Sequence, residues 1–152
     1  MTKILMVCLG NICRSPVAEG ILKHKLEQNK LEAYVDSAGT SGWHDGEQPD
    51  ERSMKNALFN GVDISNQKSR KVKLKDFEEF DYIFAMDQQN YNNLLQICPP
   101  QYQHKLNMIL NLSHPGKNLS VPDPYYTTDG FQEVFDLLDN ACNELIEKIF
   151  KN

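Results

Sequence analysis

The stretch ILMVCLGNICRSP, residues 4–16, decides the fold. Its first four residues are continuously apolar, which is typical of a strand buried on both faces of a parallel sheet. Gly10 permits a sharp turn after this strand. Ser15 and Pro16 then predict the start of a helix, with Ser15 as its cap and Pro16 at the first helical position. The stretch is therefore predicted to form a strand, a tight loop and a helix in direct succession.

Three further strands are predicted along the chain, at 34–39, 81–86 and 106–110. Helical patterns separate them, and strands that alternate with helices pair in parallel through right-handed crossovers. We therefore expect an α/β fold, a three-layer sandwich around a short parallel sheet. In such sheets a ligand lies beyond the carboxyl ends of the strands. Residues 8–15 occupy that position at the end of the first strand.

Local signals set the helix boundaries. Gly61 is predicted to stop a helix that contains residues 54–58. Asp87 is placed to cap another helix, which should end before Pro99. The final helix has the clearest apolar periodicity, with Asp129 as its expected cap and Gln132 as the capping-box partner.

Composition restricts the classes of function. The 152 residues have the length of one domain, and a net charge of -5 without a basic block argues against a nucleic-acid partner. The charged run 71–79 mixes both signs and is predicted to be solvated surface. No apolar run reaches the ~18 residues that indicate a membrane span. The short apolar start of the chain is predicted to be a strand and not a signal peptide, so we expect a cytoplasmic protein.

The chain has four cysteines, which are Cys8, Cys13, Cys98 and Cys142. Without a secretory signal they do not indicate a disulfide framework, and their spacing is not that of a zinc site. Cys142 falls in the apolar stripe of the final helix and is predicted to be inert packing. Cys98 precedes Pro99 and is expected to be structural.

Residues 8–15 have the composition of a phosphate site, with the spacing C-x5-R-S. A tight loop between a strand and a helix points successive N–H groups inward, and the helix N-terminus adds positive potential. Arg14 offers a planar fork that binds two phosphate oxygens at once. The same surroundings favour the thiolate of Cys8, which is the form that attacks phosphorus. The alternative is a buried cysteine at a strand end and an arginine at a helix start.

The chain resembles the low-molecular-weight protein tyrosine phosphatases over nearly its whole length. Five motifs in the family's order carry the resemblance, which are VCLGNICRSP at 7–16, DSAGTSG at 36–42, FDYI at 80–83, AMD at 85–87 and VPDPYY at 121–126. It implies one phosphatase domain over 1–152, with a four-stranded parallel sheet and helices on both faces. It also implies a phosphocysteine intermediate and no metal or other cofactor. The implied partners are phosphotyrosine-containing proteins or peptides, with inorganic phosphate as product.

The resemblance assigns catalytic roles to three residues. Cys8 is the implied nucleophile and Arg14 the phosphate clamp. Asp123 is implied to protonate the departing tyrosyl oxygen and then to activate the water that hydrolyses the intermediate. From the residues alone, Asp123 would be a turn residue before Pro124, so this role depends on the resemblance.

Other residues of the phosphate loop are implied to bind substrate, which are Leu9, Gly10, Asn11, Ile12, Cys13 and Ser15. In the family Asn11 holds the loop in shape, Ser37 braces Asn11, and Ser15 donates to the sulfur of Cys8. Capping or turn formation is the alternative role for each of them.

The resemblance also implies a deep slot for the tyrosine ring. Trp43 and Tyr126 match its aromatic walls and Ile12 its floor, and phosphoserine is too short to reach the nucleophile there. For Trp43 the alternative is a hydrophobic plug under a glycine-rich loop, because tryptophan commonly packs.

Two features refine the resemblance. In the family the residue at Cys13 can form a disulfide with Cys8 under peroxide, which makes Cys13 a redox candidate. Gln67 stands where many relatives carry a histidine that supports Asn11, so a small change in loop tuning is expected. None of the four histidines of the chain is expected to be catalytic.

Three alternatives to a tyrosine phosphatase are open. A phosphoarginine phosphatase of the same fold usually carries threonine at the position of Ile12, so Ile12 favours phosphotyrosine. An arsenate reductase would pass a disulfide through two further cysteines, for which Cys98 and Cys142 are wrongly placed. A non-catalytic phosphate-binding module would be expected to have lost one of the three catalytic residues, and all three are present.

Overall fold

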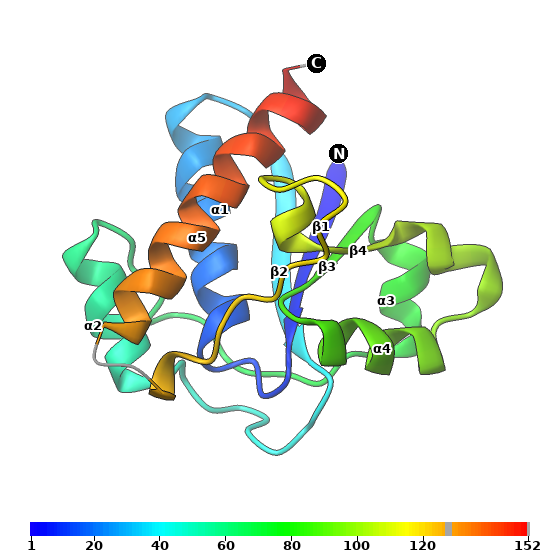
Figure 1. The fold of residues 1–152 in the computed structure, drawn as a ribbon, viewed down its shortest axis with the longest axis horizontal. Helices are drawn as coiled ribbons and strands as arrows, with labels where there is room; N and C mark the ends of the chain where they lie inside the picture. The colour runs from blue at the N-terminus through cyan, green and yellow to red at the C-terminus, as the bar shows by residue number, and fades with distance from the viewer. Residues whose placement is uncertain (127–128, 152) are drawn as a thin grey trace.

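A computed structural model describes residues 1–126 and 129–151, without the side chain of Tyr126 (Figure 1). At its centre lies a sheet of four strands, which are β1 (Thr2–Cys8), β2 (Ala33–Gly39), β3 (Tyr82–Ala85) and β4 (Leu106–Met108). Their order in the sheet is β2-β1-β3-β4, and every pair is parallel. The pairing of β1 with β2 runs from Thr2 opposite Ala33 to Cys8 opposite Gly39. The predicted fold class is confirmed.

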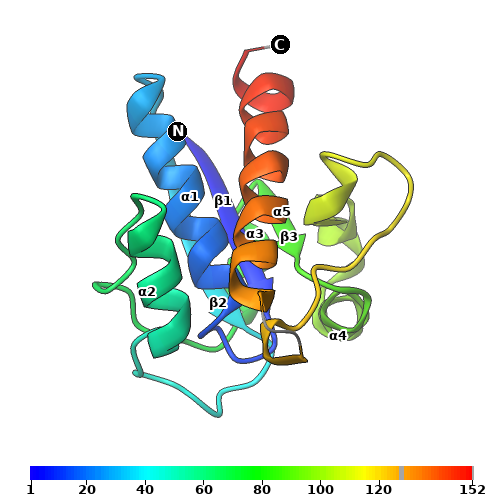
Figure 2. The same cartoon turned by 60° about the vertical axis from the view of Figure 1, so that its left-hand side comes forward.

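Helices cover both faces of the sheet (Figures 1 and 2). One face carries α1 (Arg14–Gln28), α2 (Glu51–Phe59) and α5 (Gly130–Leu145), and the other carries α3 (Leu74–Glu79) and α4 (Gln88–Ile97). Successive strand residues point to opposite faces. Ile4 and Met6 therefore join the core under α1 and α5, and Leu5 and Val7 join the core under α3 and α4. Burial on both faces explains the uninterrupted apolar run of β1.

The first helix begins earlier than predicted. Arg14 is its first residue and Cys13 occupies the cap position without a side-chain cap hydrogen bond, so the prediction of Ser15 as cap is wrong. The hydroxyl of Ser15 is instead fully buried and bonds to Cys8 and Asn11. The first turn of α1 keeps N–H groups without a side-chain cap, and such groups attract an anion.

Two other helices follow their predicted boundaries. The Asp87 side chain accepts a hydrogen bond from the N–H of Asn90, which confirms it as the cap of α4, and α4 ends at Ile97. After α2 the chain passes Gly61 with a φ of 87°, in the region that favours glycine. Both predicted boundaries are confirmed, because each depends only on residues that are close together in the sequence.

One predicted strand end and one predicted helix cap are wrong, although α5 does begin directly after Asp129. The strand predicted to reach residue 110 ends at Met108 and passes into a 3-10 turn, η2 (Ile109–Asn111), because the Asn107 side chain accepts the N–H of Met108. Asp129 makes no side-chain cap hydrogen bond, and Gln132 bonds to Asn60 instead of closing a capping box. Three further turns are η1 (Pro100–Lys105), η3 (Pro124–Tyr126) and η4 (Ile146–Phe150), the last of π type.

The charged run 71–79 is not simply solvated surface. It contains α3, in which Phe77 is fully buried and Asp76 is nearly so. Asp76 pairs with Arg70, which compensates its burial. No helix among the described residues is long and apolar enough to cross a membrane.

Candidate active site

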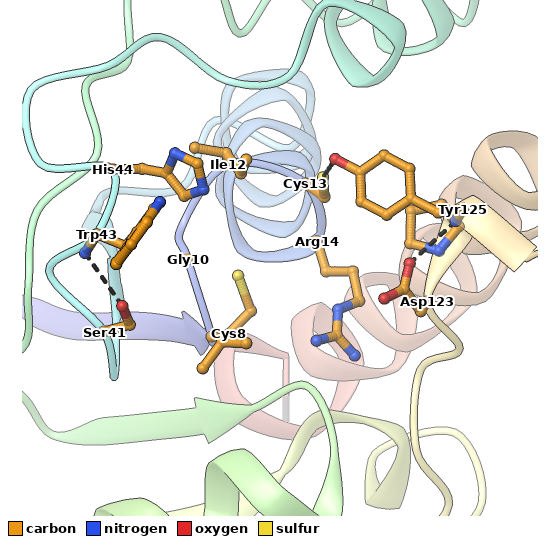
Figure 3. Close-up of a pocket in the computed structure, with 12 residues that line it drawn as sticks. Cys8, Gly10, Ile12, Cys13, Arg14, Ser41, Trp43, His44, Asp123 and Tyr125 are labelled. Atoms are coloured by element: carbon orange, nitrogen blue, oxygen red, sulfur yellow. Dashed lines mark hydrogen bonds between the residues drawn. The ribbon is translucent and has the colours of Figure 1, made fainter.

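A cavity of about 380 Å³ opens beyond the carboxyl ends of the strands (Figure 3). Its walls come from three segments: the phosphate loop at 8–15, the loop after β2, and a loop at 121–126 that we name the acid loop. The cavity brings together the three predicted catalytic residues Cys8, Arg14 and Asp123. The predicted substrate-binding residues Leu9, Gly10, Ile12, Cys13 and Trp43 also line it.

Cys8 ends β1 and is only 3% exposed. Its sulfur lies 3.3 Å from the backbone nitrogen of Asn11, which donates to it, and 3.0 Å from the hydroxyl oxygen of Ser15. The side-chain nitrogen of Asn11 already donates to that hydroxyl oxygen, so the proton of Ser15 is available to the sulfur. Both groups can donate to a sulfur anion, which stabilises the thiolate.

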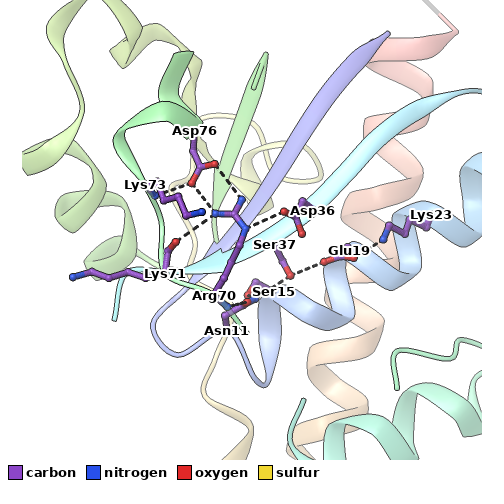
Figure 4. Close-up of polar contacts among 10 residues, drawn as sticks. All are labelled: Asn11, Ser15, Glu19, Lys23, Asp36, Ser37, Arg70, Lys71, Lys73 and Asp76. Carbon is purple, nitrogen blue, oxygen red and sulfur yellow. Dashed lines mark hydrogen bonds and ion pairs between the residues drawn. The ribbon is translucent and has the colours of Figure 1, made fainter. Parts of the chain in front are cut away.

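Asn11 fixes the turn of the phosphate loop (Figure 4). Its φ of 57° is left-handed, a region that asparagine enters more readily than most residues. Its Nδ2 donates to Ser15 at 2.8 Å and to Ser37 at 2.9 Å, and its Oδ1 accepts the N–H of Arg70 at 3.1 Å. Because Asn11 is only 2% exposed, losing these partners would leave buried polar groups unpaired.

The buried carboxyl group of Glu19 determines which groups donate and which accept in this network. Ser37 donates to Glu19 Oε1 and Lys23 donates to Glu19 Oε2, each at 2.6 Å. The hydroxyl of Ser37 therefore accepts from Asn11 while it donates to Glu19. Burial raises the pKa of Glu19, against the hydrogen bonds from Lys23 and Ser37 that favour its charged form.

Arg70 anchors the other side of Asn11. Its guanidinium forms a bidentate pair with Asp76, at 2.9 and 3.1 Å, and its Nε donates to Asp36 at 3.0 Å. Gln67 stands where many relatives carry a histidine that supports Asn11, but its hydrogen bond goes elsewhere. Its amide donates to the carbonyl of Pro16 at 2.9 Å, and its buried Oε1 has no partner within the described part of the chain.

Two hydrogen bonds from one nitrogen orient the guanidinium group of Arg14. Its Nη1 donates to Asp87 Oδ2 at 2.8 Å and to the carbonyl of Val121 at 2.9 Å. The donors on Nε and Nη2 have no partner among the residues that the structure describes, so they are available to phosphate oxygens. Asp87 thus caps α4 and orients Arg14 at the same time.

The acid loop places Asp123 at the cavity wall, where its side chain is exposed and its Oδ1 accepts the N–H of Tyr125 at 2.9 Å. The ring of Tyr125 lines the cavity, although no substrate-binding role was predicted for this residue. Tyr126 is the aromatic wall residue predicted from the resemblance, and its side chain lies outside the part of the chain that the structure describes. No local signal could have singled out Tyr125, since its partners lie far away in the sequence.

The loop after β2 supplies the remaining wall. Trp43 is 85% exposed at the cavity, so its alternative role as a buried plug is wrong. His44 also lines the cavity, with Nδ1 at 2.7 Å from Glu47 Oε2 and its ring against Gly10. Sequence reasoning missed His44, because one histidine in a glycine-rich loop carries no pattern.

All four cysteines are free thiols. Burial raises the pKa of Cys13 to about 11 and that of Cys142 to about 12. Cys142 lies in the core under α1 and α5, and Cys98 lies in the core on the opposite face of the sheet. No group of three or more His, Cys, Asp or Glu side chains in residues 1–126 and 129–151 is placed to hold a metal ion.

Known proteins of one family match this chain over nearly its whole length. The family described as low molecular weight phosphotyrosine protein phosphatase matches residues 3–152. A putative low molecular weight protein-tyrosine-phosphatase of Synechocystis is 44% identical, over 98% of this chain and 97% of its own.

Two solved structures are similar as well. A protein tyrosine phosphatase from Entamoeba histolytica with Hepes in its active site is 44% identical, with a TM-score of 0.93 over 99% of this chain and 98% of its own. A drosophila arginine phosphatase is 32% identical, with a TM-score of 0.88 over 96% of each chain. The chain therefore belongs to the low molecular weight protein-tyrosine phosphatase family of hydrolases.

Proposed function

We propose that this enzyme hydrolyses phosphotyrosine through a phosphocysteine intermediate, with Cys8 as nucleophile, Arg14 as phosphate clamp and Asp123 as general acid and base. One observation carries the proposal. These three residues line a single cavity, in which the sulfur of Cys8 lies against two hydrogen-bond donors. We propose further that residues 1–152 act as one phosphatase domain, in the cytoplasm, whose reducing conditions suit four free thiols.

In the first step, the thiolate of Cys8 attacks phosphorus in line with the tyrosyl oxygen. The new P–S bond forms as the P–O bond breaks, and the Arg14 fork together with the inward N–H groups of the loop holds the phosphoryl oxygens. Protonated Asp123 gives its proton to the departing oxygen. A tyrosine leaving group needs this proton, because the pKa of its phenol is about 10.

In the second step, the carboxylate of Asp123 takes a proton from water as the water oxygen attacks phosphorus. The P–S bond breaks, which releases inorganic phosphate and returns Cys8 as thiolate. Ser15 donates to this leaving sulfur, since its proton is directed there by Asn11. Proton transfer by a positioned group contributes about 10²–10⁴ in rate.

Aromatic walls favour a phosphorylated tyrosine over a phosphorylated serine. The rings of Trp43 and Tyr125 line the cavity and can pack against a phenyl ring. Phosphoarginine is the main competing substrate, because one similar structure is an arginine phosphatase. Ile12 at the cavity favours phosphotyrosine. The reductase alternative is not favoured, since Cys98 and Cys142 are buried in cores on opposite faces of the sheet.

The test is phosphate release from matched peptides that carry phosphotyrosine, phosphoserine or phosphoarginine, with Cys8→Ser as the blank. We expect release from phosphotyrosine alone, and none from the variant. Preference for phosphoarginine would contradict the substrate assignment. Release from no peptide would contradict the proposal as a whole.

A further inference from the structure

Tyr125 joins three segments that are distant in the sequence. Its hydroxyl lies 2.8 Å from the sulfur of Cys13 in the phosphate loop (Figure 3). The same hydroxyl lies 2.9 Å from Oδ2 of Asp50, the residue before α2. Asp50 is itself tied to the phosphate loop, because its N–H donates to the carbonyl of Ile12 at 2.7 Å. A single hydroxyl therefore bridges the acid loop, the phosphate loop and the start of α2.

The two hydrogen bonds of the Tyr125 hydroxyl each have a defined donor and acceptor. Burial raises the pKa of Cys13 to about 11, so Cys13 carries its proton at neutral pH. Burial opposes the charge of Asp50, but hydrogen bonds from Tyr125, Arg52 and Ser53 outweigh it and hold the pKa of Asp50 below its ordinary value. Because the hydroxyl has one proton, the thiol of Cys13 donates to Tyr125 and Tyr125 donates to the carboxylate of Asp50.

The ring and backbone of Tyr125 transmit this anchoring to Asp123. The guanidinium carbon of Arg52 lies 4.5 Å from the centre of the tyrosine ring, and Phe131 packs edge-on against the ring at 5.7 Å. The N–H of Tyr125 donates to Oδ1 of Asp123. Tyr125 is thus fixed by its side chain, and its backbone orients the carboxylate two residues earlier.

We propose that the Tyr125 hydroxyl is a latch, which positions Asp123 for proton transfer by tying the acid loop to Cys13 and Asp50. The inference rests on the proposed acid role of Asp123. Tyr125 is a positioning residue in this scheme, since the hydroxyl acts through Asp123 and not on the reacting atoms. Loss of the latch should therefore matter most for leaving groups that need a proton.

The test compares Tyr125→Phe with the unmodified enzyme on two substrates, a phosphotyrosine peptide and 4-nitrophenyl phosphate, whose phenol is more acidic. Both are compared by kcat/KM, which reports the step in which the phenol leaves. We expect a loss of about 10-fold on the peptide, since a hydrogen bond to a charged group is removed, and a clearly smaller loss on the nitrophenyl ester. Tyr34→Phe is the matched control, with a ring on β2 that packs on Phe80, and should change neither value.

Two outcomes separate the latch from the proposed function. If Asp123→Asn loses activity mainly on the peptide while Tyr125→Phe loses it equally on both substrates or on neither, the latch is wrong and the acid role stands. If Asp123→Asn shows no dependence on the leaving group, the acid role fails, and the latch fails with it.

A second variant shows whether Asp50 acts through the same contact. Asp50 caps α2 through Oδ1, which accepts from the N–H of Arg52, whereas Oδ2 accepts from Tyr125. In Asp50→Ser the cap survives and the second oxygen is lost. We expect the leaving-group dependence of Tyr125→Phe, and a double variant within about 2-fold of either single one. Independent, multiplying losses would contradict the latch.

Discussion

The phosphate loop and the acid loop meet at one cavity but are held in different ways. The phosphate loop is fixed by buried side chains, with Asn11, Ser15, Ser37 and Glu19 each at most 4% exposed. The acid loop carries an exposed Asp123 and depends on long-range contacts at its two ends, from Arg14 to the carbonyl of Val121 and from the hydroxyl of Tyr125 to Cys13 and Asp50.

This difference separates two tasks of the site. Binding a phosphate dianion needs many donors in a fixed array, and a buried network resists rearrangement. Giving a proton to a leaving group needs one carboxyl group at the correct place, which a few anchors can supply. Loss of a phosphate-binding group of the phosphate loop should therefore affect aryl phosphates with good and poor leaving groups equally, whereas the effect of a change in the acid loop should depend on the leaving group.

Among the variants that separate the two loops, Arg14→Lys should lose the most activity. Lysine lacks the planar fork, so it cannot hold two phosphate oxygens while bonded to Asp87 and Val121. We expect kcat/KM to fall by about 10³ on both the phosphotyrosine peptide and 4-nitrophenyl phosphate. Steady-state kinetics on the two substrates measure this. A loss confined to one substrate would contradict a role of the phosphate loop that is independent of the leaving group.

Asp123→Asn tests whether the acid loop acts on the leaving group. The amide cannot donate an acidic proton, so kcat/KM should fall by about 10² on the phosphotyrosine peptide and by much less on 4-nitrophenyl phosphate. Asp129→Asn is the matched control, because Asp129 is exposed and makes no side-chain cap hydrogen bond. Equal losses on both substrates would mean that the acid loop also serves phosphate binding.

The same contrast explains what could be predicted from the sequence. The phosphate loop is contiguous, so the spacing of Cys8 and Arg14 after an apolar run is visible without a structure. The α/β class follows from the alternation of strands and helices for the same reason. The resemblance to a family added Asp123, which the residues alone would leave as a turn.

Features built from distant residues could not be predicted. Tyr125 meets Cys13 and Asp50 across 112 and 75 positions of sequence, and no spacing indicates such contacts. The sequence did not predict the helix α3, because Phe77 is a single buried apolar residue among charged ones. Asp76 is buried only because it pairs with Arg70. Sequence patterns indicate local structure, whereas these assignments depend on tertiary partners.

Two substitutions at Asn11 measure how firmly the phosphate loop is held. Asn11→Gly removes three hydrogen bonds but accepts the left-handed backbone, so we expect the free energy of unfolding to fall by about 2 kcal/mol. Asn11→Ala adds the strain of a left-handed alanine, about 1 kcal/mol more. Urea unfolding measures both. At the exposed, left-handed Asn118 the same pair should differ by the strain alone, and an equal total loss at both sites would contradict a buried network.

The smallest effect is a pH dependence that the buried carboxylate of Glu19 gives to the phosphate loop. Burial raises the pKa of Glu19 in the folded state, so the folded chain holds this proton at pH values where the unfolded chain, with a pKa of about 4.3, has lost it. The free energy of unfolding therefore declines as pH rises through the interval between the two values. Glu19→Gln cannot titrate and keeps an oxygen for Ser37, so its decline over that interval should be smaller.

Urea unfolding of both proteins across this interval measures the difference. Glu51→Gln is the matched control, because Glu51 is exposed on α2 and pairs only with Lys55 among its described neighbours. A steeper decline in Glu19→Gln than in the unmodified chain would reverse the sign. It would mean that Lys23 and Ser37 together overcome the cost of burial, and that the ionised carboxylate itself stabilises the phosphate loop.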